Sequence, residues 1–112
     1  MIARTWRGAV RAEDADRYLA YLEETGLANY RTTPGNRGAT VFRRILGNEC
    51  EFLILSLWES RKSIEAFAGS DIGRARFYPE DDRFLVNRDL TVNHYEVVWS
   101  SLDDLSASGP PS

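Results

Sequence analysis

His94 is the only histidine in the chain, and it precedes Glu96 by two residues. Side chains two residues apart in a strand point to the same face, so the imidazole and the carboxylate are expected to be neighbours. A neutral imidazole beside a carboxylate can act as a general base near neutral pH. His94 is therefore the candidate catalytic residue. The alternative is a structural histidine, hydrogen-bonded within the sheet or at a contact between two copies.

Other common catalytic centres are not indicated by the sequence. One histidine and one glutamate supply too few ligands for zinc. Cys50 is the only cysteine, which excludes a disulfide within the chain. The chain has no Gly-rich phosphate loop and no nucleophile elbow. We therefore expect neither a metal nor a cofactor.

Aromatic side chains form a second candidate set. An apolar cavity with a few polar groups is the usual form of a small-molecule site, and aromatic rings that converge between helices and sheet would make one. The alternative is core packing, in which aromatic residues are equally common. The set consists of Trp6, Tyr18, Phe67, Phe77 and Tyr78.

Arg4 lies two residues before Trp6 and should share its face of the first strand. If that face meets the helices, the buried charge needs a carboxylate or a ligand anion. A structural ion pair is the favoured interpretation, with Glu96 as partner if the first and last strands are neighbours. A substrate-binding role is the alternative.

The elements that must position these residues follow a β-α-β-β-α-β order. Strands are predicted at residues 2–10, 39–46, 51–58 and 91–99, with a first helix over 12–28 that ends or frays at Gly26. Ser60 is a plausible N-cap of the second helix, which Gly69 interrupts, Ser70 restarts and Pro79 ends. Residues 79–82 are predicted to form an exposed turn. The order predicts a ferredoxin-like α+β domain with a four-stranded antiparallel sheet over residues 1–99, and a flexible tail over 100–112.

The third strand predicts a partner for the sheet. Both helices should cover one face, yet the strand is apolar on both faces, with Leu53, Leu55 and Leu57 on the face without helices. Exposing three leucines would forfeit roughly 5–9 kcal/mol, against a domain stability of about 5–15 kcal/mol. A second copy of the chain is the simplest cover, which predicts a homodimer. The alternative is that the C-terminal segment folds over this face.

Charge and hydropathy exclude several partners. The net charge of −3 without a basic block makes nucleic acid a poor candidate. The chain has no apolar run of membrane-spanning length, and its first residues do not resemble a signal peptide. We therefore expect no membrane partner and a cytoplasmic location.

Two local motifs carry a family resemblance. The Pro34-Gly35-Asn36-Arg37-Gly38 turn before the second strand, and the Leu57-Trp58-Glu59-Ser60 step from the third strand into the second helix, resemble the antibiotic biosynthesis monooxygenase domain over about residues 1–99. The resemblance implies a dimeric α+β barrel built from ferredoxin-like protomers.

The resemblance also implies what the protein does. The family includes members that oxidise polyaromatic phenols with dioxygen and no cofactor, members that degrade heme, and many without an assigned activity. A cofactor-independent monooxygenase acting on a small aromatic or phenolic substrate is the leading hypothesis, with His94 deprotonating the substrate. The alternatives are a non-catalytic dimeric module that binds a small hydrophobic ligand and, less favoured, a heme-binding protein.

The heme-degrading branch resembles the chain through Trp58. That branch also has an asparagine on strand one, a second tryptophan in helix two and an axial histidine. Those three positions fall near Trp6, on Phe67 and on Phe77. Phenylalanine cannot ligate iron, so the resemblance argues against axial heme binding. It still predicts a pocket lined by these three aromatic residues.

Overall fold

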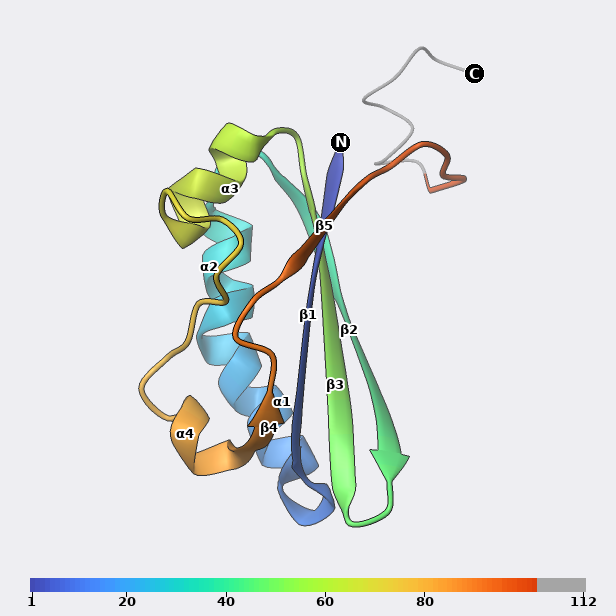
Figure 1. The fold of residues 1–112 in the computed structure, drawn as a ribbon, viewed down its shortest axis with the longest axis vertical. Coiled ribbons are helices and arrows are strands. Elements are labelled where there is room, and N and C mark those ends of the chain that lie inside the picture. The colour runs from blue at the N-terminus through green and yellow to red at the C-terminus, as the bar shows by residue number, and fades with distance from the viewer. Residues whose placement is uncertain (103–112) are drawn as a thin grey trace.

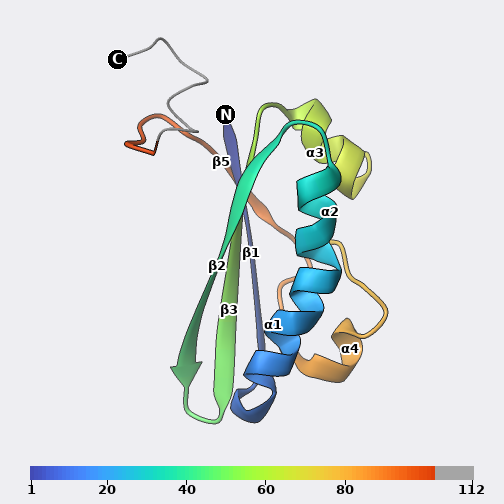
Figure 2. The same ribbon diagram turned by 180° about the vertical axis from the view of Figure 1, so that it is seen from behind.

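The computed structural model describes residues 1–102, and the last ten residues of the predicted tail lie outside this range. A twisted antiparallel sheet is covered on one face by all of the helices, and its other face is bare (Figures 1 and 2). This architecture confirms the predicted ferredoxin-like α+β class. The elements in chain order are β1 (Ile2–Arg11), η1 (Ala12–Asp14), α1 (Ala15–Glu24), α2 (Gly26–Thr32), β2 (Asn36–Leu46), β3 (Glu49–Trp58), α3 (Arg61–Ala68), α4 (Asp81–Phe84), β4 (Leu85–Arg88) and β5 (Asn93–Glu96).

The strand order is β2-β3-β1-β4, and β5 also pairs with β1. In the β1–β3 ladder, Arg4 lies opposite Ser56 and Trp6 lies opposite Ile54. Trp58, Ile54 and Phe52 therefore face the helices and are buried. The neighbouring leucines of β3 lie on the bare face, as the alternation of the sequence predicts.

The first helical region is longer than predicted. Thr25 has φ −114° and ψ −97°, which breaks the helix, but Gly26 begins α2 instead of ending the region. Tyr30 lies at the end of α2 and is buried against the rings of Trp58 and Phe67, with centroid distances of 5.7 and 4.6 Å. Tertiary packing thus stabilises a helical turn that the local sequence does not favour.

The second helix begins as predicted and ends early. Ser60 caps α3 and forms a reciprocal capping box with Ser63. The predicted restart at Ser70 is wrong, because residues 69–80 form no helix. Gly69 has φ 87° and ends α3, and the backbone N–H of Ala75 then donates to the Leu90 carbonyl at 3.0 Å. The segment satisfies its backbone across the fold instead of along a helix.

The predicted last strand over 91–99 is replaced by two short strands on the same edge of β1. The first, β4, pairs its Leu85 with Val10, and the second, β5, pairs its His94 with Arg4. Between them the chain leaves the ladder, and the Trp6 indole N–H donates to the Asp89 carbonyl at 2.8 Å. A tryptophan side chain therefore fills the gap that an unbroken strand would have closed.

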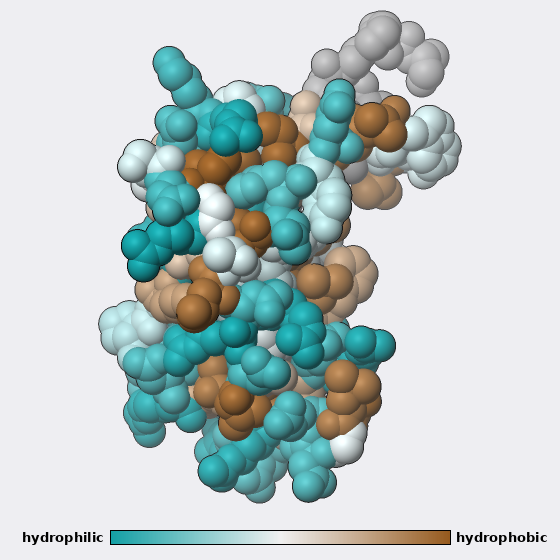
Figure 3. All heavy atoms as spheres, viewed as in Figure 1, coloured by the Kyte–Doolittle hydropathy of each residue, from teal (hydrophilic) through white to brown (hydrophobic). Residues whose placement is uncertain are grey.

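The bare face keeps a large apolar surface. Phe42 is 50% exposed and Leu53 is 38% exposed, while Leu55 and Leu57 are half-buried. Residues 97–102 do not cover this face, since Val98 and Trp99 are more than four-fifths exposed and the chain runs away from the sheet (Figure 1). Figure 3 shows brown hydrophobic surface where the chain leaves β5 and at the edge of the bare side. Among residues 1–102 no helix is long and apolar enough to span a membrane.

Candidate functional site

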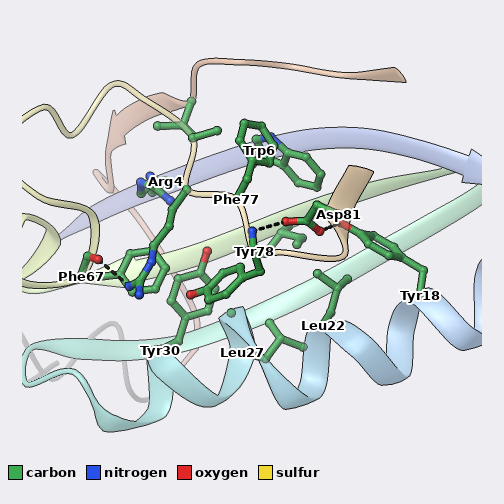
Figure 4. A pocket seen from close by; sticks show the side chains of 15 residues that line it. Arg4, Trp6, Tyr18, Leu22, Leu27, Tyr30, Phe67, Phe77, Tyr78 and Asp81 are labelled. Atoms are coloured by element: carbon green, nitrogen blue, oxygen red, sulfur yellow. Dashed lines mark hydrogen bonds between the residues drawn. The ribbon is translucent and has the colours of Figure 1, made fainter. Parts of the chain in front are cut away.

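A cavity lies between the sheet and the helices (Figure 4). It offers about 40 Å³ to the centres of water molecules, enough for roughly three of them. Residues from β1, β3, the four α-helices, the irregular segment 69–80 and Val92 line it. The structure brings six of the predicted site residues to this cavity: Arg4, Trp6, Tyr18, Phe67, Phe77 and Tyr78.

Trp6 and Phe77 form one aromatic wall. Their rings meet edge to face with centroids 6.2 Å apart. Trp6 can lie flat along β1 because residue 8 is glycine: a Cβ there would stand 2.4 Å from the Trp6 Cη2 atom. The absence of a side chain at Gly8 therefore positions one wall of the cavity.

Arg4 brings a buried cation to the cavity. Its side chain is 3% exposed, and one Nη donates to the Arg74 carbonyl at 3.2 Å. The Nε atom is buried and has no hydrogen-bond partner. Burial lowers the pKa of the guanidinium, and the neighbouring Tyr30 opposes this change. The favoured ion pair with Glu96 is not formed, and no carboxylate among residues 1–102 pairs with Arg4.

A second arginine, Arg76, was not singled out from the sequence. Its guanidinium donates to the Phe67 carbonyl at 2.8 Å and lies 5.0 Å from the Phe67 ring centroid. Arg4 lies 5.6 Å from the centroid of the same ring. Both cations are thus held beside one aromatic side chain at the cavity. No local sequence signal indicates this position, because Arg76 lies in a segment predicted to be helical.

Tyr30 is another lining residue that the sequence did not reveal. Burial raises the pKa of its hydroxyl, and the positive charge of Arg4 opposes that rise. On the same side, the Tyr78 hydroxyl accepts a hydrogen bond from Asn29 Nδ2 at 2.7 Å. Tyr30 lies beyond the expected end of the first helix, and Tyr78 is hydrogen-bonded to Asn29 in the extension of that helix. The missed helical turn therefore concealed Tyr30, whereas Tyr78 was predicted from the sequence.

Asp81 corrects the prediction of an exposed turn over residues 79–82. It is 4% exposed and lines the cavity. One carboxylate oxygen accepts from the Tyr18 hydroxyl at 3.2 Å, and the other accepts from the Tyr78 backbone N–H at 2.6 Å. Burial is the main cause that raises the pKa of the carboxyl, and these hydrogen bonds oppose it. A raised pKa makes the Asp81 carboxylate a stronger proton acceptor than an ordinary exposed aspartate.

His94, the predicted base, is not one of the lining residues. It lies directly opposite Arg4 in the β1–β5 ladder, and its Nε2 atom is buried without a partner. Burial lowers the pKa of the imidazole, and the positive charges of Arg4 and Arg61 lower it further. The charges that act on His94 are thus cations, whereas the sequence suggested the carboxylate of Glu96.

The cavity does not fit heme, which the family resemblance raises as a less favoured ligand. A porphyrin with its four pyrrole rings exceeds a space for a few water molecules. Phe77 stands where the resemblance places an axial histidine, and its ring packs on Trp6. Residues 1–102 contain no group of three histidine, cysteine, aspartate or glutamate side chains that could hold a metal ion. We derive no step through heme or metal.

Fold and site together define a ferredoxin-like α+β protein with an aromatic cavity between sheet and helices. The family model for antibiotic biosynthesis monooxygenase matches residues 1–75, more than half of the chain. The chain therefore belongs to the antibiotic biosynthesis monooxygenase family. A search of curated proteins gave no match.

Solved structures share the fold at low sequence identity. A Bacillus cereus protein classed with the antibiotic biosynthesis monooxygenases is 18% identical with a TM-score of 0.64, and the match covers 91% of this chain and 95% of that chain. Rv0793 from Mycobacterium tuberculosis is 18% identical with a TM-score of 0.60, covering 90% and 98%. The heme degrader MhuD from Mycobacterium tuberculosis, with two hemes in its active site, is 19% identical with a TM-score of 0.54, covering 89% and 98%.

Proposed function

We propose that the protein is a cofactor-independent monooxygenase that oxidises a small aromatic or phenolic substrate with dioxygen. The observation that carries the proposal is the cavity itself, in which aromatic rings surround Arg4, Arg76 and the carboxyl of Asp81. Aromatic walls suit a flat apolar substrate, and positive charge stabilises the anion that forms when the substrate loses a proton. Family membership supports the reaction type.

The proposed reaction needs a base and no cofactor. Proton loss gives an electron-rich carbanion or phenolate, which reduces dioxygen directly. With an anthrone-type substrate, the methylene carbon becomes a carbonyl, one oxygen atom enters the product and the other leaves as water. Two residues are candidates for the base: His94, from the sequence, and Asp81, from its place in the cavity wall. Asp81 has the better position, because it lines the cavity and His94 does not.

Oxygen uptake tests this function. The purified protein, freed of flavin and metal ions, is incubated with an anthrone-type substrate while oxygen consumption and quinone formation are followed. We expect uptake above the spontaneous rate. Removal of the base should lower the rate of uptake at least about tenfold, since general base catalysis usually contributes more than that. Asp81→Asn and His94→Gln decide between the two candidates. Absence of uptake above the spontaneous rate would refute the function.

We further propose that the protein is a homodimer in which the second copy covers the bare face. Support comes from the exposed side chains of Phe42 and Leu53 on that face. On the same face the Glu51 carboxylate accepts from Arg7 Nε at 2.6 Å and from Arg44 Nε at 2.8 Å. The charged side chains of this cluster are therefore paired within one copy of the chain. A face with internally paired charges and exposed apolar side chains suits a self-complementary contact. A cytoplasmic location stays a prediction, which cell fractionation would test.

The second candidate function is a non-catalytic dimeric module that binds a small hydrophobic ligand. The position of His94 outside the cavity lining favours this alternative. Ligand binding without oxygen uptake would support it. Heme binding is the third candidate, and a titration that leaves the Soret band of added heme unshifted would dispose of it.

A further inference from the structure

Arg4 carries a charge that the protein leaves unbalanced. The side chain is almost completely buried, and the groups around it are the Arg74 carbonyl, the Tyr30 hydroxyl and the Phe67 ring. None of these is an anion at neutral pH. The Nε–H group has no acceptor at all. A buried charge without a counter-ion is costly unless something supplies the missing partner.

The rest of the cavity does not supply that partner. Asp81 is the one carboxylate among the lining residues, and both of its oxygens are engaged, one by the Tyr18 hydroxyl and one by the Tyr78 backbone N–H. Arg76 adds a second cation beside the Phe67 ring. The lining of the cavity therefore contains two guanidinium groups and a single carboxylate that is already occupied.

We propose that the cavity binds its ligand as an anion, and that the anionic oxygen accepts a hydrogen bond from Arg4 Nε. The ligand class is an aromatic acid, whose carboxylate or acidic hydroxyl meets the guanidinium while its ring lies against the aromatic walls. Guanidinium groups are well suited to bind such oxygens because their N–H donors lie in a fixed plane. This inference rests on the proposed function in taking the cavity as the substrate site.

The size of the cavity defines what must move. Space for roughly three water molecules accommodates a carboxylate group but not the ring attached to it. Phe77 is half-buried and belongs to the segment 69–80, which has no regular secondary structure. Ligand entry therefore requires this segment to shift, which makes Phe77 the side chain expected to move most.

Paired probes of equal shape test the inference. Benzoate and 2-naphthoate are compared with benzamide and 2-naphthamide by calorimetry, using the full chain. We expect each acid to bind at least about tenfold more tightly than its neutral amide, since a charge-assisted hydrogen bond contributes about that much. The Nε–H resonance of Arg4 should shift when the acid is added to the wild-type protein. Equal binding of acid and amide, or failure of both acids to bind, would overturn the proposal.

Variants locate the effect. Arg4→Met should remove the preference for the acid, while Arg31→Met, on the exposed surface of α2, should retain it. Arg4→Met that keeps the preference would overturn the assignment, and if this variant does not fold, the resonance shift in the wild type decides. Oxygen uptake is scored separately: acid preference without uptake refutes only the proposed function, and uptake without acid preference refutes only this inference.

Discussion

Arg4 and His94 face one another across the β1–β5 ladder, and each has a buried side-chain nitrogen without a hydrogen-bond partner. The Nε–H donor of Arg4 and the Nε2 atom of His94 thus lie in the same region of the fold, and neither has a hydrogen-bond partner. Buried polar atoms without partners are rare in folded proteins and mark places that bind something or hold a proton. His94, the base predicted from the sequence, therefore lies next to Arg4, the residue proposed to bind the ligand anion.

The imidazole should titrate below its ordinary range. Burial and the charges of Arg4 and Arg61 lower the pKa of His94, and Glu96, on the same face, is exposed and too weak to reverse this. Proton NMR of the ring against pH should report the lowered value, and Arg4→Met should move it back toward 6.5 while Arg31→Met leaves it unchanged. A pKa at or above 6.5 in the wild type would contradict the assignment of these charges.

The same pKa change has a consequence for stability. The unfolded chain binds a proton at His94 at higher pH than the folded chain does, so stability decreases as pH falls through the ordinary histidine pKa toward the lowered folded value. His94→Gln should reduce this part of the pH dependence of the melting temperature. An unchanged melting profile between pH 7 and pH 5 in the variant relative to the wild type would refute the linkage.

Asp81→Asn should destabilise the protein. The buried carboxylate accepts from both Tyr18 and the backbone of Tyr78, and an amide offers only one oxygen to these two donors. Leaving one buried donor unsatisfied costs about 1–3 kcal/mol. Chemical denaturation should show this loss, whereas Asp82→Asn, at an exposed neighbour, should stay within about 0.5 kcal/mol. Equal stability of the two variants would mean that Asp81 is not buried as described.

Gly8→Ala should disturb the tryptophan wall. The added Cβ would lie 2.4 Å from Trp6 Cη2, so the indole must move and its hydrogen bond to the Asp89 carbonyl is lost. We expect a loss of about 1–3 kcal/mol, typical of overpacking, and a change in tryptophan fluorescence. Gly73→Ala is the matched control, because a Cβ there meets nothing closer than 3.6 Å. A wild-type emission spectrum in Gly8→Ala would contradict the packing of Trp6.

A charge on the bare face should separate the two copies. Leu53→Glu places a carboxylate on the bare face next to Glu51, which already engages Arg7 and Arg44, so burying the added charge in the proposed contact is costly. Sedimentation velocity should show a dimer for the wild type and a monomer for the variant. Ala20→Glu, on the exposed side of α1, should remain dimeric. A monomeric wild-type protein would refute the homodimer.

Part of this structure could be read from the sequence. The alternation of β3 sets its two faces, and the polar side chain of Ser60 before an apolar helix marks the start of α3, so both were predicted correctly. The helical restart after Gly69 was not, because the spacing of Ile72, Ala75 and Phe77 suits a helix equally well and only the contact of Ala75 with Leu90 decides. Long-range hydrogen bonds of this kind leave no local signal.

The candidate site was predicted unevenly for the same reason. The aromatic residues and Arg4 could be placed on faces of strands and helices, where periodicity determines direction. Asp81 sits in an acidic stretch that is typical of solvent-exposed loops, and its burial depends on Tyr18, more than sixty residues earlier. Whether His94 points into the cavity depends on how β4 and β5 divide the edge of β1, which the sequence of either strand alone does not determine.

The most direct test combines the reaction with the binding site. Oxygen uptake by the cofactor-free protein with an anthrone-type substrate is measured at increasing concentrations of 2-naphthoate. We predict uptake above the spontaneous rate. We also predict competitive inhibition by the acid but not by its amide, because the substrate and the acid are both proposed to bind in the cavity at Arg4. A rate that never exceeds the spontaneous oxidation would contradict the central claim.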